Sequence, residues 1–128
     1  MRLTLVRHGE ASPATDGNDI KRPLTSRGHA QAKQTAGFLK DQVIPDIFVV
    51  SPLLRAQETL SYLQAIFPEV AVLICDKIKP DDHAKDAIDW LSQLPFENIV
   101  VVCHMNVVAH IAEQLTHESF NPYALAEA

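Results

Sequence analysis

Two histidines and two arginines stand close to the ends of apolar segments in this sequence. Arg7 and His8 follow an apolar run near the N-terminus, His104 follows the most apolar run, and Arg55 lies shortly after a third. An arginine binds an oxyanion through two parallel hydrogen bonds, and a histidine acts as a nucleophile or a proton shuttle. Together these residue types favour a compact, multiply charged oxyanion, for which phosphate is the natural candidate.

Phosphoryl transfer to a histidine is the reaction that this set of side chains could perform. A neutral His8 would attack phosphorus in line and form a phosphohistidine, which water would then hydrolyse. His104, Arg7 and Arg55 would hold the non-bridging oxygens and stabilise charge in the transition state. Because fixed cations would take the electrostatic role of a metal ion, we predict no metal site and no other cofactor.

Strand and helix candidates alternate along the chain, which predicts an α/β fold with a parallel sheet. The carboxyl ends of parallel strands share one edge of a sheet, so His8 and His104 should meet there. We expect four strands, at about 2–6, 47–50, 70–75 and 99–103. Four helices should begin near Thr25 or Ser26, at Ser51-Pro52, at Asp81-Asp82 and near Asn106, the last running to about Thr116.

The helix starts predict where further functional side chains lie. Ser51 is a good N-cap and Pro52 fits the first helical position, which puts Arg55 in the first turn. Helical side chains lean toward the N-terminus, so Arg55 could reach back to the strand ends. Asp81 and Asp82 would load the first turn of the third helix, at the positive end of its dipole.

Length and composition limit the classes of protein that fit. The 128 residues suit a single domain, 1–128, and 47% of them are hydrophobic. The net charge of −5 argues against a general nucleic-acid surface, and no apolar run approaches the ~20 residues of a membrane span. Cys75 and Cys103 each close an apolar run and read as reduced core residues. We expect a soluble, cytoplasmic protein without nucleic-acid or membrane partners.

The motifs in order resemble those of the histidine phosphatase superfamily, which has the phosphoglycerate-mutase-like fold. The resemblance covers about residues 1–117 and is carried by Arg7-His8-Gly9, Ser51-Pro52-Leu53-Leu54-Arg55-Ala56-Gln57-Glu58-Thr59 and the strand-final His104. Within the superfamily, segments 22–28 and 104–108 resemble those of the SixA-type phosphohistidine phosphatases. Any one motif is weak evidence, but all of them in order at compatible spacing are strong evidence.

The resemblance implies a role for each matching residue. His8 is the expected nucleophile, and Arg7, Arg55 and His104 are expected phosphate ligands. Arg22 matches a further arginine that contacts phosphate in the phosphohistidine phosphatases. The implied fold is a three-layer α/β/α sandwich whose first four strands have the order third, second, fourth, first.

The sequence departs from the superfamily pattern in two places. Larger relatives place a general acid after the third strand. Asp76, Asp81 and Asp82 lie in that neighbourhood here but none aligns convincingly, and Asp81 and Asp82 are the candidates for the role. A phosphohistidine needs little acid help to lose its imidazole, so this departure favours phosphohistidine over phosphate esters. Relatives also continue with edge strands, one of them antiparallel. The edge strands here should be shortened: either they are missing or the tail pairs differently.

The leading functional prediction is a metal-independent phosphatase that acts on phosphohistidine in a signalling phosphotransfer protein. The short connections predict a shallow pocket open to a macromolecule. One alternative is a small-molecule phosphomonoesterase of the same superfamily, which would need a carboxyl group to protonate its leaving group. Another is a non-catalytic module that binds phosphate-like anions or a phosphoprotein.

Overall fold

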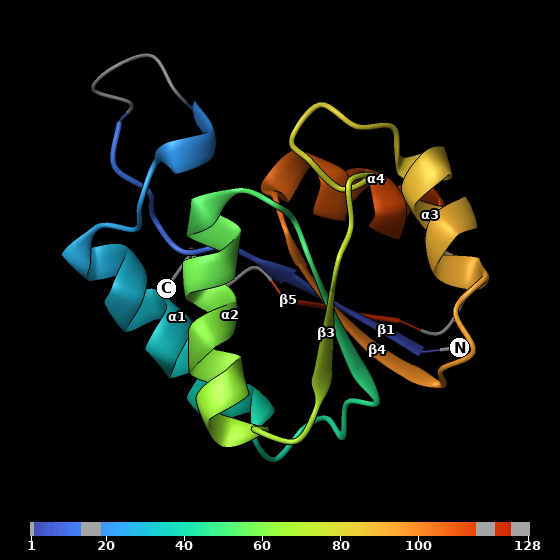
Figure 1. Ribbon diagram of the computed structural model, residues 1–128, viewed down its shortest axis with the longest axis horizontal. Helices are drawn as coiled ribbons and strands as arrows, with labels where there is room; N and C mark the ends of the chain where they lie inside the picture. Colours follow the sequence, from blue (N-terminus) through green and yellow to red (C-terminus); the bar gives the residue numbers. More distant parts are fainter. Residues whose placement is uncertain (1, 14–18, 115–119, 124–128) are drawn as a thin grey trace.

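A five-stranded parallel sheet runs through the computed structural model, which describes residues 2–13, 19–114 and 120–123 (Figure 1). The strands have the spatial order β3-β2-β4-β1-β5, and each neighbouring pair is parallel. Their bounds are β1 (Arg2–Arg7), β2 (Ile47–Val50), β3 (Ala71–Ile74), β4 (Asn98–Cys103) and β5 (Phe120–Tyr123). The predicted parallel sheet and the order of its first four strands are confirmed.

Two pairs of helices cover the two faces of this sheet (Figure 1). The helices are α1 (Ser26–Leu39) and α2 (Leu54–Ile66) on one face, and α3 (Ala84–Ser92) and α4 (Met105–Gln114) on the other; a 3-10 turn, η1 (Asp19–Lys21), precedes α1. Neighbouring residues of β4 serve opposite faces. Val100 packs in the core with α1 and α2, and Val101 packs in the core with α3 and α4. This arrangement confirms the three-layer sandwich and explains why β2, and β4 from Ile99 onward, are apolar.

The predicted start of the second helix is wrong by a few residues. The helix α2 begins at Leu54 after the cap residue Leu53, whose side chain makes no capping hydrogen bond. Ser51 does not cap the helix, because its hydroxyl contacts His104 and accepts a hydrogen bond from the Leu53 N–H. The arginine of this motif still lies in the first turn of α2.

The predicted start of the third helix is also wrong. The helix α3 begins at Ala84 after His83, so Asp81 and Asp82 lie before it rather than in its first turn. The Asp82 carboxylate accepts a hydrogen bond of 2.8 Å from the Lys79 backbone N–H. Its role is therefore to close the turn that leads into α3.

The edge of the sheet beyond β1 carries a strand that the sequence did not predict. The strand β5 is four residues long and pairs parallel with β1, in a register that places Leu3 opposite Phe120. Of the two predicted outcomes for this edge, the tail pairs differently. The fourth helix begins at Met105, one residue before its predicted start, and its predicted end at Thr116 lies outside the described residues. Within the described part of the chain, no helix has the length and apolar character to cross a membrane.

Candidate active site

Three neighbouring strands end side by side and bring His8, His104 and Ser51 to one edge of the sheet. Arg7 and Cys103 are paired in register, and the His8 N–H donates to the Cys103 carbonyl oxygen at 3.1 Å. The Ser51 N–H donates to the Val102 carbonyl oxygen of β4, also at 3.1 Å. The rings of His8 and His104 lie edge to face with their centroids 5.1 Å apart. The structure thus joins the two histidines that the sequence placed at strand ends.

The hydrogen bonds of His8 fix its tautomer. Its Nδ1 lies 2.5 Å from the Gly9 carbonyl oxygen, and its Nε2 lies 3.3 Å from the Arg55 Nε. A carbonyl only accepts and a guanidinium only donates, so Nδ1 carries the hydrogen and Nε2 carries the lone pair. Burial is the main cause that lowers the pKa of His8 to about 4, with smaller contributions from Arg55 and Arg7. At neutral pH His8 is therefore an uncharged imidazole whose Nε2 can act as a nucleophile.

His104 is more deeply buried than His8, with 2% of its surface exposed. Its Nε2 lies 2.8 Å from the Ser51 Oγ, while its Nδ1 is buried and has no hydrogen-bond partner among the described atoms. Burial lowers the pKa of His104 to about 3, and the positive charge of Arg55 acts in the same direction. This imidazole is therefore neutral as well.

Two of the predicted arginines converge on one carboxylate. Arg55 donates from Nη1 to the Asp19 carbonyl oxygen at 2.9 Å and from Nη2 to its Oδ2 at 3.2 Å. Arg22 donates from Nη1 to Asp19 Oδ1 at 2.9 Å, and its Nε is fixed by the Ser12 carbonyl oxygen at 2.6 Å. Arg7 lies partly buried at the end of β1, close enough for its charge to lower the pKa of His8. The geometry shows that Arg55 and Arg22 can share one anion.

Asp19 is a residue of this site that the sequence analysis missed. Its pKa is lowered chiefly by the hydrogen bond from Arg22, with Arg55 adding to the effect, so the carboxylate stays ionised. No spacing rule marks a single acid inside a polar loop. One local signal was available: Asp19 lies three residues before Arg22, a spacing that allows an ion pair across the single turn η1.

Close backbone packing holds the His8 loop against α1 and α2. The Gly9 N–H donates to the buried Thr59 Oγ1 at 3.1 Å, and Thr59 Oγ1 donates to the Arg55 carbonyl oxygen at 2.9 Å. A Cβ atom on Gly28 would overlap the Glu10 carbonyl oxygen, and one on Gly9 would overlap the Gly28 carbonyl oxygen. The loop and the helix starts therefore approach each other more closely than side chains allow.

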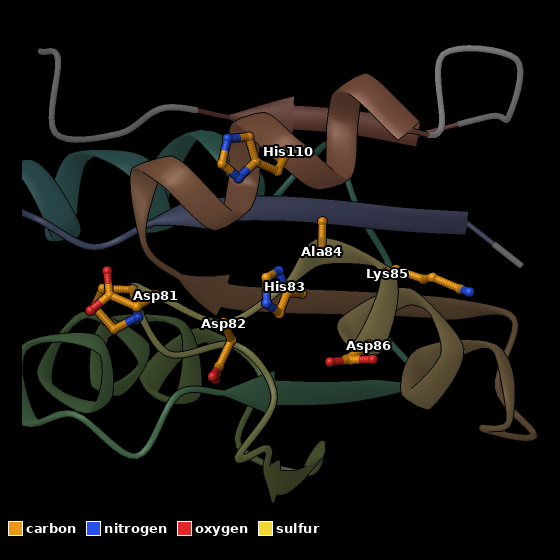
Figure 2. Close-up of a pocket in the computed structure, with 8 residues that line it drawn as sticks. Asp81, Asp82, His83, Ala84, Lys85, Asp86 and His110 are labelled. Carbon is orange, nitrogen blue, oxygen red and sulfur yellow. The ribbon is translucent and has the colours of Figure 1, made fainter.

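The two candidate general acids line a pocket that does not include the histidine pair. Asp81 and Asp82 line an open pocket of about 550 Å³ together with His83 and His110. Figure 2 shows these side chains around the pocket. Asp82 lies 3.3 Å from the Lys79 Nζ, which balances its charge. His8, Arg55 and His104 do not line this pocket. Among the described residues, no cluster of histidine, cysteine, aspartate and glutamate side chains could hold a metal ion.

Comparison with known proteins identifies the family of this chain. Residues 3–79 match the family model of the histidine phosphatase superfamily (branch 1). The chain belongs to the histidine phosphatase superfamily. It is 32% identical over 143 residues to the phosphohistidine phosphatase SixA homolog of Haemophilus influenzae, covering 99% of this chain and 87% of that relative. Over 120 residues it is 26% identical to SixA of Escherichia coli, covering 90% of this chain and 74% of the relative.

Solved structures of the superfamily share this fold. The structure of the protein histidine phosphatase SixA complexed with tungstate superposes with a TM-score of 0.77 at 28% identity, over 90% of this chain and 77% of that one. A phosphoglycerate mutase from Plasmodium falciparum superposes with a TM-score of 0.65 at 23% identity, over 88% of this chain and 67% of that one. The second likeness is one of fold and confirms the phosphoglycerate-mutase-like architecture.

The two buried histidines should make folding stability depend on pH. In the unfolded chain each takes up a proton below its ordinary pKa of 6.5, but in the folded protein only below about 4 for His8 and about 3 for His104. Between about pH 4 and pH 6.5 the unfolded state therefore binds more protons than the folded state. The free energy of unfolding should fall as the pH drops from about 6.5 to about 4, by at most about 1.4 kcal/mol per pH unit for each histidine.

Urea unfolding in phosphate-free buffer at pH 7, 6 and 5 would measure this dependence. The variant His104→Asn should show a shallower fall than the wild type, because it lacks one of the two depressed groups. Equal slopes in both proteins would contradict the assignment of His104 as a buried neutral imidazole.

Proposed function

We propose that this chain is a phosphohistidine phosphatase that works through a phosphohistidine intermediate on His8. The observation that carries the proposal is the state of His8: Nδ1 donates to the Gly9 carbonyl oxygen, and the Nε2 lone pair faces Arg55. A buried, uncharged imidazole with a fixed lone pair is suited to attack on phosphorus. The names of its relatives in the superfamily, two of them phosphohistidine phosphatases of the SixA type, support the same activity.

The proposed reaction has two steps. His8 Nε2 attacks the phosphorus atom, and the bond from phosphorus to the substrate imidazole nitrogen breaks as the new N–P bond forms. The leaving nitrogen takes its proton from solvent or from a general acid. Water then attacks the phosphorus, releases inorganic phosphate and returns the electron pair to His8 Nε2.

The cations around His8 are assigned to the phosphoryl oxygens. Arg55 and Arg22 already share the Asp19 carboxylate, which supports their holding a common anion. Arg7 and His104 complete the proposed set of phosphate ligands. A phosphoryl group brings three oxygens and more charge than one carboxylate, so it should displace Asp19 from Arg55.

The proposed substrate is a phosphohistidine on a phosphotransfer protein. Asp81 and Asp82 line their own pocket, which fits a reaction with a leaving group that needs little acid help. The tungstate complex of the related SixA supports a site for a phosphate-like tetrahedral anion. Both cysteines are free and buried, in keeping with a cytoplasmic location.

Phosphate release from two substrates tests this assignment. A phosphotransfer domain phosphorylated on histidine should lose its phosphate with a kcat/KM at least about a hundred-fold above that for an aryl phosphate ester. Higher activity on the ester would favour a small-molecule phosphomonoesterase. Binding of tungstate without release from either substrate would favour a non-catalytic phosphate-binding module.

The phosphomonoesterase alternative makes a separate prediction about the acids. The open pocket beside α3 holds Asp81 and Asp82 and could admit a small molecule. If either acid protonates an ester oxygen, Asp81→Asn or Asp82→Asn should lower ester turnover by about a hundred-fold or more. The phosphohistidine phosphatase proposal predicts that both variants keep their phosphohistidine activity within a factor of about three.

A further inference from the structure

Ser51 is the side chain at the strand edge to which the proposed reaction gives no role. It is fully buried, at 0% exposure, and follows the last residue of β2. Its Oγ lies 2.8 Å from His104 Nε2 and accepts a hydrogen bond of 3.3 Å from the Leu53 N–H. The hydroxyl therefore connects the backbone before α2 to the second histidine of the site.

The contacts of this hydroxyl favour His104 Nε2 as the acceptor of its hydrogen. A backbone N–H can only donate, so the Leu53 N–H uses one lone pair of Ser51 Oγ. The hydroxyl then has one hydrogen of its own to donate. Of the groups in contact with it in the described structure, His104 Nε2 is the one that can accept this hydrogen.

The unpartnered nitrogen of His104 is the second observation. If Nε2 accepts from Ser51, the ring hydrogen of the neutral imidazole is on Nδ1. That atom is buried and has no partner among the described atoms, although buried donors are nearly always paired. A phosphoryl oxygen at the His8 ring, 5.1 Å away between ring centroids, would supply the acceptor that this donor lacks.

We infer that Ser51 is a positioning residue that holds His104 in the Nδ1–H tautomer, so that Nδ1 donates to an oxygen of the transferring phosphoryl group. The inference rests on the proposed function, because it needs the phosphoryl group to bind between the two histidines. Ser51 makes no contact with substrate in this account. It prepares the donor before the substrate arrives, which removes the cost of reorienting His104 in the reaction.

The tautomer is measured directly by long-range ¹H–¹⁵N NMR of the imidazole rings. In the wild type at pH 7, His104 should show a protonated Nδ1 and an unprotonated Nε2. In Ser51→Ala, His104 should lose this single pattern and show protonation at Nε2 or a mixture of tautomers. A wild-type His104 protonated at Nε2 would overturn the inference, whether or not the variant folds.

Tungstate binding supplies the functional readout. Ser51→Ala should weaken tungstate binding by about 10- to 100-fold, the effect of losing one hydrogen bond to a charged group. Ser51→Thr, which keeps the hydroxyl, should bind within a few-fold of the wild type. The control Ser61→Ala changes an exposed serine of α2 whose hydroxyl donates to the Glu58 carbonyl oxygen, and it should leave both readouts unchanged.

The outcomes separate this inference from the proposed function. If wild-type protein fails to bind tungstate, the proposed phosphoryl site is wrong even where the NMR pattern is as expected. If wild-type protein binds tungstate and Ser51→Ala binds it equally well with His104 still protonated at Nδ1, the role of Ser51 is wrong and the phosphoryl site stands.

Discussion

Replacing His8 with alanine should lower phosphate release from a phosphohistidine protein by about a thousand-fold or more. The side chain is the one neutral imidazole in the described site whose Nε2 lone pair faces an arginine, and alanine provides no atom that can form a bond to phosphorus. The measurement is the initial rate of phosphate release at pH 7 with saturating substrate. Binding of tungstate should persist in His8→Ala, because the arginines and His104 remain.

A matched histidine gives the control for this result. His29 lies on α1, where its Nδ1 contacts the Tyr62 hydroxyl at 2.9 Å and no phosphate ligand is proposed. His29→Ala should keep its rate within a few-fold of the wild type. Retention of more than about a tenth of the activity in His8→Ala would rule out His8 as the nucleophile.

Replacing Gly28 with alanine should be more damaging than the same change at the other two glycines in the described part of the chain. The new Cβ would overlap the Glu10 carbonyl oxygen, and backbone atoms cannot rotate away as a flexible side chain can. We expect the free energy of unfolding to fall by about 2 to 4 kcal/mol. The loop that carries His8 must also shift away from α1, so activity should fall together with stability.

The same helix contains a glycine at which the same substitution should have the opposite effect on stability. Gly37 is exposed on α1, and a Cβ there would meet no atom within 4 Å. Gly37→Ala should therefore raise the free energy of unfolding by about 0.5 to 1 kcal/mol, since alanine restricts the unfolded chain and favours a helix. Urea unfolding of both variants measures the difference. An equal change in the free energy of unfolding for Gly28→Ala and Gly37→Ala would show that the backbone around Gly28 can relax to accept a Cβ atom.

Much of the sheet and of the site followed from local sequence. The apolar run of β2 was predicted with its observed bounds, Ile47–Val50, because a strand covered on both faces needs continuous hydrophobic residues. The meeting of His8 and His104 followed from their positions after parallel strands. The order of the strands came from the family resemblance, because apolar runs alone do not say which strands are neighbours.

The features that the sequence did not predict depend on contacts between distant segments. Ser51 has the residue type of a helix cap, and only its closeness to His104 reveals that its hydroxyl is used elsewhere. Asp82 closes a turn with Lys79 instead of lying in a helix, because its carboxylate accepts a hydrogen bond from the Lys79 backbone N–H. The strand β5 has a weak apolar pattern of its own and is defined by its pairing with β1.

Trapping the phosphoenzyme tests directly whether His8 is the nucleophile. Wild-type protein would be mixed with a phosphotransfer domain carrying ³²P on histidine, quenched in alkali within milliseconds and digested for peptide analysis. We expect a label that is stable in alkali, is lost in acid, lies on the peptide containing His8 and is missing in His8→Ala. Phosphate release without a labelled enzyme at any time, or a label on another residue, would contradict this role of His8.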